Sequence, residues 1–338
     1  MLVGLLILSA IVGGAFAGDL GGGDDIADEP GGGGDPSDPN QTLEGTDGED
    51  DLRAGGGDDL INGFAGDDIL AGFIGNDVLN GGDGDDRLEG GFDDDTLDGG
   101  ADDDIVLGGR GVDLVAGGAG DDNVQGGEDD DVVFGGAGND TVLGNEGDDT
   151  VSGDAGDDSV QGDDGDDSIS GGAGDDFIFG QAGSDTLQGD GGNDFLHGAG
   201  IDGPNAFDDP DAGTTRGDVL DGGDGDDFIA FGDRDVATGG TGFDLFAVGT
   251  WIEGDAPGTI TDYDPNEDLI TIFFEAGTTP PEVTVETVGG DTEILLDGAR
   301  AAIVTGVTGI TSDQILLVDD TGLPVFAGDA SGSGPSAA

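Results

Sequence analysis

Residues 135–143 read Gly-Gly-Ala-Gly-Asn-Asp-Thr-Val-Leu, and seventeen units of this form follow one another without a gap from Gly45 to His197. Every unit has Asp at its sixth position and an aliphatic residue at its eighth. The first and fourth positions are Gly except at Ala54, Asp93, Asp102 and Asp129. A period kept over so many units is typical of a solenoid, in which each unit buries its apolar side against its neighbours.

Each unit predicts a three-residue strand and a tight turn. In Thr141-Val142-Leu143 the middle side chain points opposite to its two neighbours, so we expect the aliphatic eighth position to face inward. The glycines before it supply the positive φ angles that a chain reversal demands. Two successive units then make one coil, with two short strands facing each other across a layer of aliphatic side chains. The predicted fold is all-β: a parallel β-roll, a right-handed β-helix or solenoid with neighbouring strands about 4.8 Å apart.

The charge of the chain is extreme. Its 79 Asp and Glu residues face only six Lys and Arg, which gives a formal net charge of -73 over 338 residues. Nucleic acid and acidic membrane surfaces are therefore excluded as partners, because binding them depends on a basic surface. Cysteine is absent, so neither a disulfide framework nor a thiolate metal site can form. Small cations are the expected counter-charge.

Stacked coils would bring the sixth-position carboxylates together. Each would lie within roughly 5 Å of its equivalents in the neighbouring coils, where like charges repel by about 1 kcal/mol per pair even in water. We therefore expect a bridging metal ion. Ca²⁺ fits best because it takes six to eight oxygens in irregular geometry and accepts backbone carbonyls, whereas Mg²⁺ demands a strict octahedron. Zn²⁺ would need His or Cys, of which the chain has one and none.

The repeat resembles the nonapeptide of the RTX (repeats-in-toxin, haemolysin-type) calcium-binding family, Gly-Gly-x-Gly-x-Asp-x-aliphatic-x, over residues 45–249. The resemblance implies that loops bind Ca²⁺ between successive coils through the sixth-position Asp and nearby backbone carbonyls, with up to about 15 ions in the main block. The Asp residues at the fourth position depart from the family pattern and put the loop geometry of their units in question. The implied ligands are Asp50, Asp59, Asp68, Asp77, Asp86, Asp95, Asp104, Asp113, Asp122, Asp131, Asp140, Asp149, Asp158, Asp167, Asp176, Asp185, Asp194, Asp218, Asp227 and Asp244.

The remaining segments are predicted from composition. Residues 1–17 are an apolar run ending in Ala-Phe-Ala, read as an export signal or a retained anchor, and 18–44 form an acidic Gly/Pro-rich linker. Residues 198–212 interrupt the period as a loop, and further repeats occupy 213–249, with a degraded unit around Asp235. Residues 250–320 contain short β-branched runs that predict a small antiparallel β cap, and 321–338 are read as a flexible tail.

Export can be read in two ways. Residues 260–270 look like the strand-turn sequence that follows the repeats in RTX proteins, and the resemblance implies a C-terminal signal for type I secretion. The N-terminal apolar run suggests a signal peptide instead. Both readings predict a secreted bacterial protein, which could remain associated with the cell surface. A membrane partner follows only if the N-terminal segment is retained.

Three functions remain open. The first is an extracellular calcium-binding protein with a structural or adhesive role, which folds as it binds Ca²⁺ after secretion. The second is a calcium-dependent module for a glycan or for a cell-surface or matrix ligand, using outward residues such as Ile105, Leu107, Phe177, Phe179 and Phe195. We expect these residues not to form a contiguous stripe, because their units are not adjacent. The third is a hydrolase of unrecognised type.

Catalysis is not expected. The chain contains no His-Glu-x-x-His zinc motif and no Gly-x-Ser-x-Gly nucleophile elbow. The single histidine, His197, occupies a ninth position and is predicted to be an outward surface residue.

Overall fold

The computed structural model describes residues 39–198, 217–249, 257–275, 277–319 and 324–326. The predicted export segment 1–17 lies outside these ranges, as do most of the linker 18–44, of the insert 198–212 and of the tail 321–338. Among the described residues, no helix is both long and apolar enough to cross a bilayer.

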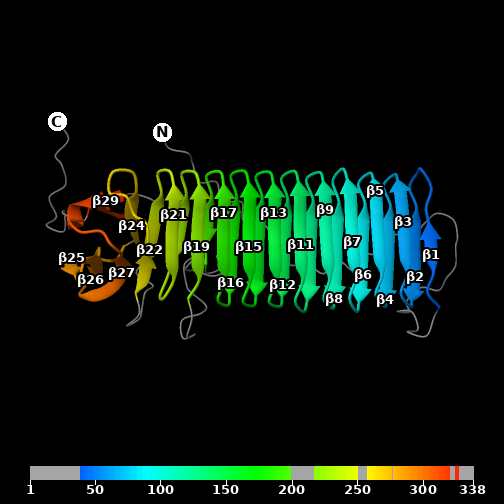
Figure 1. The fold of residues 1–338 in the computed structure, drawn as a ribbon, viewed down its shortest axis with the longest axis horizontal. Helices are drawn as coiled ribbons and strands as arrows, with labels where there is room; N and C mark the ends of the chain where they lie inside the picture. Colours follow the sequence, from blue (N-terminus) through cyan, green and yellow to red (C-terminus); the bar gives the residue numbers. More distant parts are fainter. Residues whose placement is uncertain (1–38, 199–216, 250–256, 276, 320–323, 327–338) are drawn as a thin grey trace. The chain divides into compact units, whose positions relative to one another are not determined.

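Two facing sheets of mostly parallel strands make up the fold, and consecutive strands alternate between them (Figure 1). The odd sheet has 15 strands and the even sheet has 14. In spatial order the odd sheet contains β1 (Thr42–Glu44), β3 (Leu60–Ala65), β5 (Val78–Asp83), β7 (Thr96–Ala101), β9 (Leu114–Ala119), β11 (Val132–Ala137), β13 (Thr150–Ala155), β15 (Ser168–Ala173), β17 (Thr186–Gly191), β19 (Val219–Asp224), β21 (Val236–Thr241), β23 (Gly258–Ile260), β27 (Ala299–Val304), β26 (Asp291–Leu296) and β25 (Val283–Val288).

The even sheet lies opposite. It contains β2 (Asp51–Gly56), β4 (Ile69–Ile74), β6 (Arg87–Phe92), β8 (Ile105–Arg110), β10 (Asn123–Glu128), β12 (Thr141–Glu146), β14 (Ser159–Asp164), β16 (Phe177–Ala182), β18 (Phe195–His197), β20 (Phe228–Phe231), β22 (Leu245–Gly249), β24 (Leu269–Phe274), β28 (Ile315–Asp319) and β29 (Pro324–Phe326). The 3₁₀ helix η1 (Ser312–Gln314) precedes β28.

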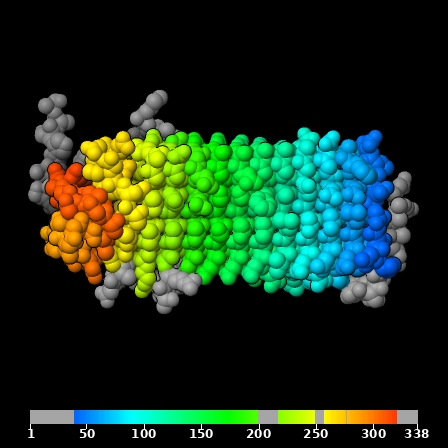
Figure 2. All heavy atoms as spheres, viewed as in Figure 1, coloured from blue at the N-terminus to red at the C-terminus, as the bar shows by residue number. Residues whose placement is uncertain are grey.

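The predicted β-roll, with two nonapeptide units in each coil, is confirmed. Strand β10 pairs in parallel with β12, and Val124 lies opposite Val142, the equivalent residue two units later. Figure 2 shows this stacking from one side, coil against coil. The eighth-position side chains from Ile61 to Leu196 are at most 1% exposed and form one continuous apolar core between the sheets. Their burial provides the non-directional part of the stability.

The strands are longer than predicted. Typical strands such as β12 span six residues, from the seventh position of one unit to the third position of the next. The first-position glycine is therefore a strand residue with its Cα facing inward, and only positions four to six form the turn. At the fourth position Asp93, Asp102 and Asp129 adopt φ angles of 76°, 78° and 82°, so these units keep the same turn as the glycine units. Asp tolerates this left-handed region better than most residues do.

The coil register continues past the predicted insert. Thr186 in β17 pairs with Val219 in β19, so the chain between these two strands is longer than in the coils before it. The additional length equals that of the segment 198–212, which leaves the pairing of the flanking coils unchanged. The first strand, Thr42–Glu44, lies within the range predicted as linker and pairs with β3.

Antiparallel strands are present at the C-terminal end, as predicted. They are β25 with β26, β26 with β27, and β28 with β29. Other strands of the predicted cap instead extend the solenoid, because β24 and β28 are parallel to β22 and β27 is parallel to β23. The C-terminal cap is therefore continuous with both sheets of the solenoid.

Candidate calcium sites

The sixth-position aspartates form two hydrogen-bonded ladders, one along each edge of the solenoid. In each step, the backbone N–H of one Asp donates to Oδ1 of the Asp one coil later, as from Asp140 to Asp158 at 2.7 Å. The first ladder, before the even strands, joins Asp50, Asp68, Asp86, Asp104, Asp122, Asp140, Asp158, Asp176, Asp194, Asp227, Asp244 and Asp268. The second, before the odd strands, starts at the N–H of Gln41 and joins Asp59, Asp77, Asp95, Asp113, Asp131, Asp149, Asp167, Asp185, Asp218 and Asp235.

Every aspartate predicted as a ligand lies on one of these ladders. All except the partly buried Asp50 are fully buried. Asp235 and Asp268 are also on the ladders and were missed, because they lie where the period slips. Their signal was present in the sequence: each stands two residues before an inward apolar residue, Ala237 or Ile270.

Fifth-position side chains form a second set of ladders that sequence reasoning also missed. The N–H of Asn139 donates to Oδ1 of Asp121 at 2.8 Å, and the N–H of Asp157 donates to Oδ1 of Asn139 at 2.8 Å. Here the acceptor belongs to the earlier coil, which is opposite to the sixth-position ladder. Each loop is thus tied to both neighbours. The recurrence of Asp or Asn at the fifth position was the available signal.

In most of the sixth-position carboxylates that the structure describes, the second oxygen lacks a hydrogen-bond donor. Within the described residues, Oδ2 is buried and accepts no hydrogen bond in Asp68, Asp77, Asp86, Asp95, Asp104, Asp113, Asp122, Asp131, Asp140, Asp149, Asp158, Asp167, Asp176, Asp194 and Asp227. A buried anionic oxygen without a partner costs several kcal/mol, depending on its surroundings. Such an atom, repeated in nearly every coil, requires a cation.

The first-position glycine leaves space beside this oxygen. A Cβ placed on Gly153 would lie 2.5 Å from Oδ2 of Asp158 and 2.6 Å from the carbonyl oxygen of Gly171 in the next coil. A carboxylate oxygen and a carbonyl oxygen therefore face the same small volume. Among the described residues, no three His, Cys, Asp or Glu side chains gather into a metal cluster. Backbone carbonyls would have to complete the coordination, and Ca²⁺ accepts such ligands readily.

Burial changes the acidity of these carboxyl groups. Burial and, to a smaller extent, neighbouring ladder carboxylates raise the pKa of Asp95 and Asp104 to about 8, against the lowering effect of the hydrogen bond from the preceding ladder Asp. The same causes raise the pKa to about 7 in Asp131, Asp158, Asp167 and Asp227. Burial also raises the pKa to about 6 in Asp77, Asp86, Asp113, Asp122, Asp149, Asp176, Asp194 and Asp244. In Asp113, Asp149 and Asp194 the neighbouring charges come from aspartates outside the ladders. Without a cation, the ladder thus favours protons.

The model of the RTX calcium-binding nonapeptide repeat matches residues 44–79, 71–106, 80–115, 107–142, 143–178, 170–200 and 212–233, which together make up more than half of the chain. The chain belongs to the RTX calcium-binding nonapeptide repeat family. The family binds calcium, in agreement with the oxygen-only surroundings of Oδ2. No curated protein matches the sequence of this RTX protein.

Solved structures similar to this RTX protein include the following three. One is a hyperactive, Ca²⁺-dependent, β-helical antifreeze protein from an Antarctic bacterium, with 22% identity, a TM-score of 0.38, and coverage of 73% of this chain and 82% of that one. Another is the AlgE6R3 subunit of the Azotobacter vinelandii mannuronan C5-epimerase, with 23% identity, a TM-score of 0.24, and coverage of 52% and 86%. The third is the extracellular lipase LipA from Serratia marcescens, with 15% identity, a TM-score of 0.24, and coverage of 74% and 44%.

Substituting Gly153 by Ala is expected to remove one calcium site. Gly153 does not have a positive φ, so its backbone angles suit Ala, but the added Cβ would occupy the volume between Asp158 Oδ2 and the Gly171 carbonyl and push that carbonyl aside. We expect a loss of about one bound Ca²⁺ per chain in equilibrium dialysis. Ala173→Gly, at an exposed third position, is the control and should keep the wild-type count. A Gly153→Ala protein with an unchanged calcium count would place the ion elsewhere.

A cluster of aromatic rings covers part of the outer face of the even sheet. Ring centroids are 5.9 Å apart for Phe177 and Phe195, 5.7 Å for Phe179 and Phe195, and 4.9 Å for Phe195 and Phe228. The expectation that the five outward residues form no contiguous stripe is therefore wrong for Phe177, Phe179 and Phe195, whereas Ile105 and Leu107 lie on β8, separated from β16 by three strands. Neighbouring strands of one sheet come from every second unit of the sequence, so β16 and β18 are adjacent.

His197 also departs from its prediction. It lies on β18 beside the rings of Phe179 and Phe195, at centroid distances of 6.4 and 6.3 Å, and is only 3% exposed. His197 therefore points outward from the sheet, as its ninth position predicts, but it is buried among aromatic side chains on this part of the face.

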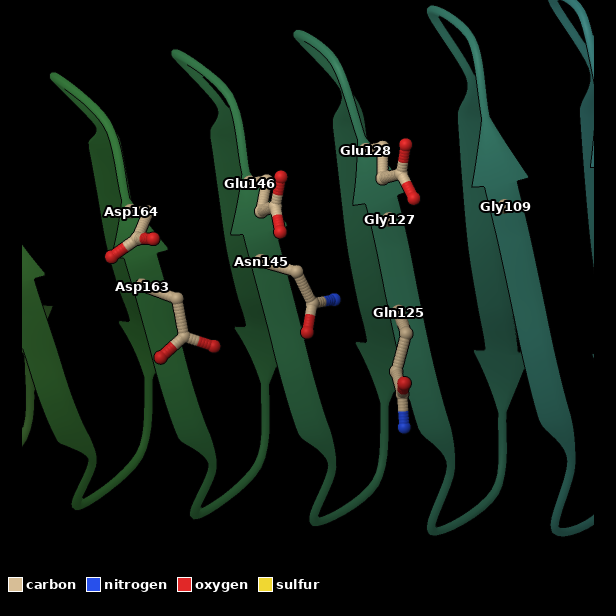
Figure 3. A pocket seen from close by; sticks show the side chains of 8 residues that line it. All are labelled: Gly109, Gln125, Gly127, Glu128, Asn145, Glu146, Asp163 and Asp164. Atoms are coloured by element: carbon tan, nitrogen blue, oxygen red, sulfur yellow. The ribbon is translucent and has the colours of Figure 1, made fainter. Parts of the chain in front are cut away.

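A shallow groove of about 450 Å³ runs along the same face over β8 to β14 (Figure 3). Its walls are acidic and amide side chains on successive strands: Gln125, Glu128, Asn145, Glu146, Asp163 and Asp164. Near the aromatic cluster, Asp163 Oδ1 accepts hydrogen bonds from the amides of Gln161 at 2.6 Å and Gln181 at 2.5 Å. The face therefore offers hydrogen-bonding groups at one end and apolar rings at the other.

Proposed function

We propose that this RTX β-roll is an extracellular calcium-binding protein whose repeat block folds as it binds several Ca²⁺ ions and then has a structural or adhesive role. The observation that carries the proposal is the row of buried Oδ2 atoms without donors, next to carbonyl oxygens of the following coil. The interior ladder aspartates are the proposed ligands, with up to about 15 ions in the main block. No catalytic step is assigned to any residue.

The dependence of folding on calcium binding also supports secretion. Calcium sites in extracellular modules have dissociation constants of about 10⁻⁴ to 10⁻³ M, so they stay empty in a cytoplasm and fill outside. A chain that depends on such sites would remain unfolded for export and fold on arrival. An N-terminal signal and a C-terminal type I signal remain alternative routes.

Counting bound ions tests the proposed ligands. Asp140→Ala and Asp158→Ala are each expected to remove about one equivalent of Ca²⁺, because each deletes one of the donor-free oxygens. Asp98→Ala makes the same charge change at an exposed ninth position and should keep the full count. The measurement is equilibrium dialysis at saturating calcium. Identical counts in all four proteins would show that the ladder does not hold the ions.

A second candidate function is binding of a neutral glycan on the outer face of the even sheet. The aromatic cluster is contiguous, and Phe177 is 51% exposed at its edge. The adjoining groove offers carboxylates and amides that can hydrogen-bond hydroxyl groups. The acidic surface disfavours anionic polysaccharides.

A glycan array probed with and without calcium tests this face. Binding to neutral glycans is expected in calcium and is expected to weaken about tenfold in Phe177→Ala, which corresponds to about 1.4 kcal/mol of lost contact with the ring. Phe64→Ala removes an equally exposed phenyl ring from the odd sheet and serves as the control. Equal binding by both variants would exclude the aromatic cluster as the binding surface.

A further inference from the structure

Three of the four ends of the two aspartate ladders differ from the interior. At interior positions such as Asp158, Oδ1 accepts the N–H of the preceding ladder residue and Oδ2 accepts nothing. At the C-terminal end of the first ladder, both oxygens of Asp268 accept backbone N–H groups, Oδ1 from Asp244 at 3.1 Å and Oδ2 from Asp264 at 2.6 Å. The oxygen that lacks a donor in the interior therefore has one at this end.

Asp235 and Asp50, at two other ladder ends, also have a local donor on Oδ2, whereas Asp59, at the start of the second ladder, accepts the N–H of Gln41 on Oδ1 as interior residues do. In Asp235, which ends the second ladder, Oδ1 accepts the N–H of Asp218 at 2.9 Å and Oδ2 accepts the N–H of Gly232 at 2.5 Å. In Asp50, at the N-terminal start of the first ladder, Oδ2 accepts both the N–H and the hydroxyl of Thr46, at 2.6 and 2.9 Å. In each case the donor to Oδ2 comes from a residue three or four positions earlier in the chain.

An N–H donor and a cation compete for the same side of an oxygen. A hydrogen bond of about 2.6 Å to a carboxylate directs the positive end of the N–H dipole at Oδ2, and a Ca²⁺ ion on that side would have to displace it. The donor also neutralises part of the carboxylate charge that makes a bridging ion necessary elsewhere. In these three carboxylates, local backbone N–H groups therefore provide the positive partner that a Ca²⁺ ion would provide to Oδ2 in the interior of the ladders.

We propose that Asp50, Asp235 and Asp268 are terminating residues, which bind backbone N–H groups in place of calcium and so fix the start of the first row of calcium sites and the C-terminal ends of both rows. The inference rests on the proposed function, since it assumes that interior ladder residues hold Ca²⁺. It removes Asp50 from the ligands that the sequence predicts. It also gives Asp235 and Asp268 a role other than ligation.

The C-terminal end is closed by further contacts that need no metal. The carboxylate of Asp262 accepts the N–H groups of Gly239 and Gly240 at 2.9 and 2.8 Å. The ring of Tyr263 is buried, 6.3 Å from the ring of Phe246 at the end of the apolar core. One short turn, residues 260–268, thus satisfies exposed strand donors, covers the core and terminates a ladder. Solenoids need such an end to avoid exposing an apolar coil.

Calcium counts in conservative variants of the full chain test the proposal. Asp158→Asn is expected to lower bound calcium by about one equivalent, whereas Asp268→Asn, Asp235→Asn and Asp50→Asn keep the wild-type count. Asn retains the Oδ1 acceptor that Asp235 and Asp268 provide to their ladders, and in all three residues it places an NH₂ group against the local donor. The terminating variants should therefore show a lower thermal midpoint in calcium, a readout independent of ion number.

The possible outcomes separate the two proposals. A loss of one equivalent in Asp268→Asn or Asp50→Asn, equal to that in Asp158→Asn, overturns the terminating role and leaves the ladder sites in place. An unchanged count in Asp158→Asn overturns the proposed function itself. Asp50→Asn lies at the opposite end from the cap, so it tests the terminating role even if Asp268→Asn fails to fold.

Discussion

Removing calcium at pH 8 is expected to unfold the repeat block. In the folded chain the interior ladder carboxylates are buried, and in most of them Oδ2 has no donor. Ionising them side by side without a bridging ion adds both desolvation and repulsion between neighbouring coils. Because every coil carries two such residues, the cost recurs along the entire solenoid, while the apolar core contributes only one thin layer of Leu, Ile and Val.

Circular dichroism during a Ca²⁺ titration measures this effect. We expect a disordered spectrum in EDTA and a large, cooperative gain of β signal near millimolar Ca²⁺. Mg²⁺ at the same concentration is the control and should give little change, because it binds dedicated oxygen cages reluctantly. Limited proteolysis in the same samples should show the repeat block becoming resistant only in calcium. A chain that stays compact and protease-resistant after exhaustive chelation at low ionic strength would contradict the role assigned to the ladders.

The architecture was largely predictable because every unit of the sequence repeats the same pattern of buried and metal-facing positions. Aspartate at the sixth position and an aliphatic residue at the eighth specify a period of nine, and two such periods give the register of Val124 opposite Val142. Strand length was predicted poorly because glycine suggests a turn. The first-position Gly153 is instead in a strand, where the absence of Cβ leaves room for Asp158.

Features that arise from neighbours in space were harder to predict. The aromatic cluster was missed because Phe177 and Phe195 were compared as units in sequence, although the strands in contact come from every second unit. The ladder ends could not be predicted from the repeat. The donors to Asp235 and Asp268 come from Gly232 and Asp264, residues whose positions follow no period.

Acidifying the metal-free chain is expected to restore part of the β structure lost in EDTA. Burial raises the pKa of the ladder carboxyls to about 6 in Asp86, about 7 in Asp158 and about 8 in Asp95, whereas an unfolded Asp has a pKa of about 3.9. Raised values mean that the fold binds protons more tightly than the unfolded chain. Their contribution to stability is therefore complete below about pH 4 and is lost as the pH rises through about 6 to 8.

The same shifts reverse the pH dependence once calcium is present, because Ca²⁺ and protons compete for the same carboxylates. Calcium binding at pH 7 should release protons, and the midpoint of the calcium titration should move to higher concentration as the pH falls. Calorimetry in two buffers of different ionisation enthalpy measures the release, and circular dichroism of the metal-free chain from pH 8 to pH 4.5 measures the regained structure. Asp95→Asn mimics the protonated residue and should raise the stability of the metal-free chain at pH 8, whereas Asp98→Asn, at an exposed position, should not. A metal-free chain equally unfolded at both ends of this pH range, with no proton release on binding calcium, would show that the buried carboxylates do not control the fold.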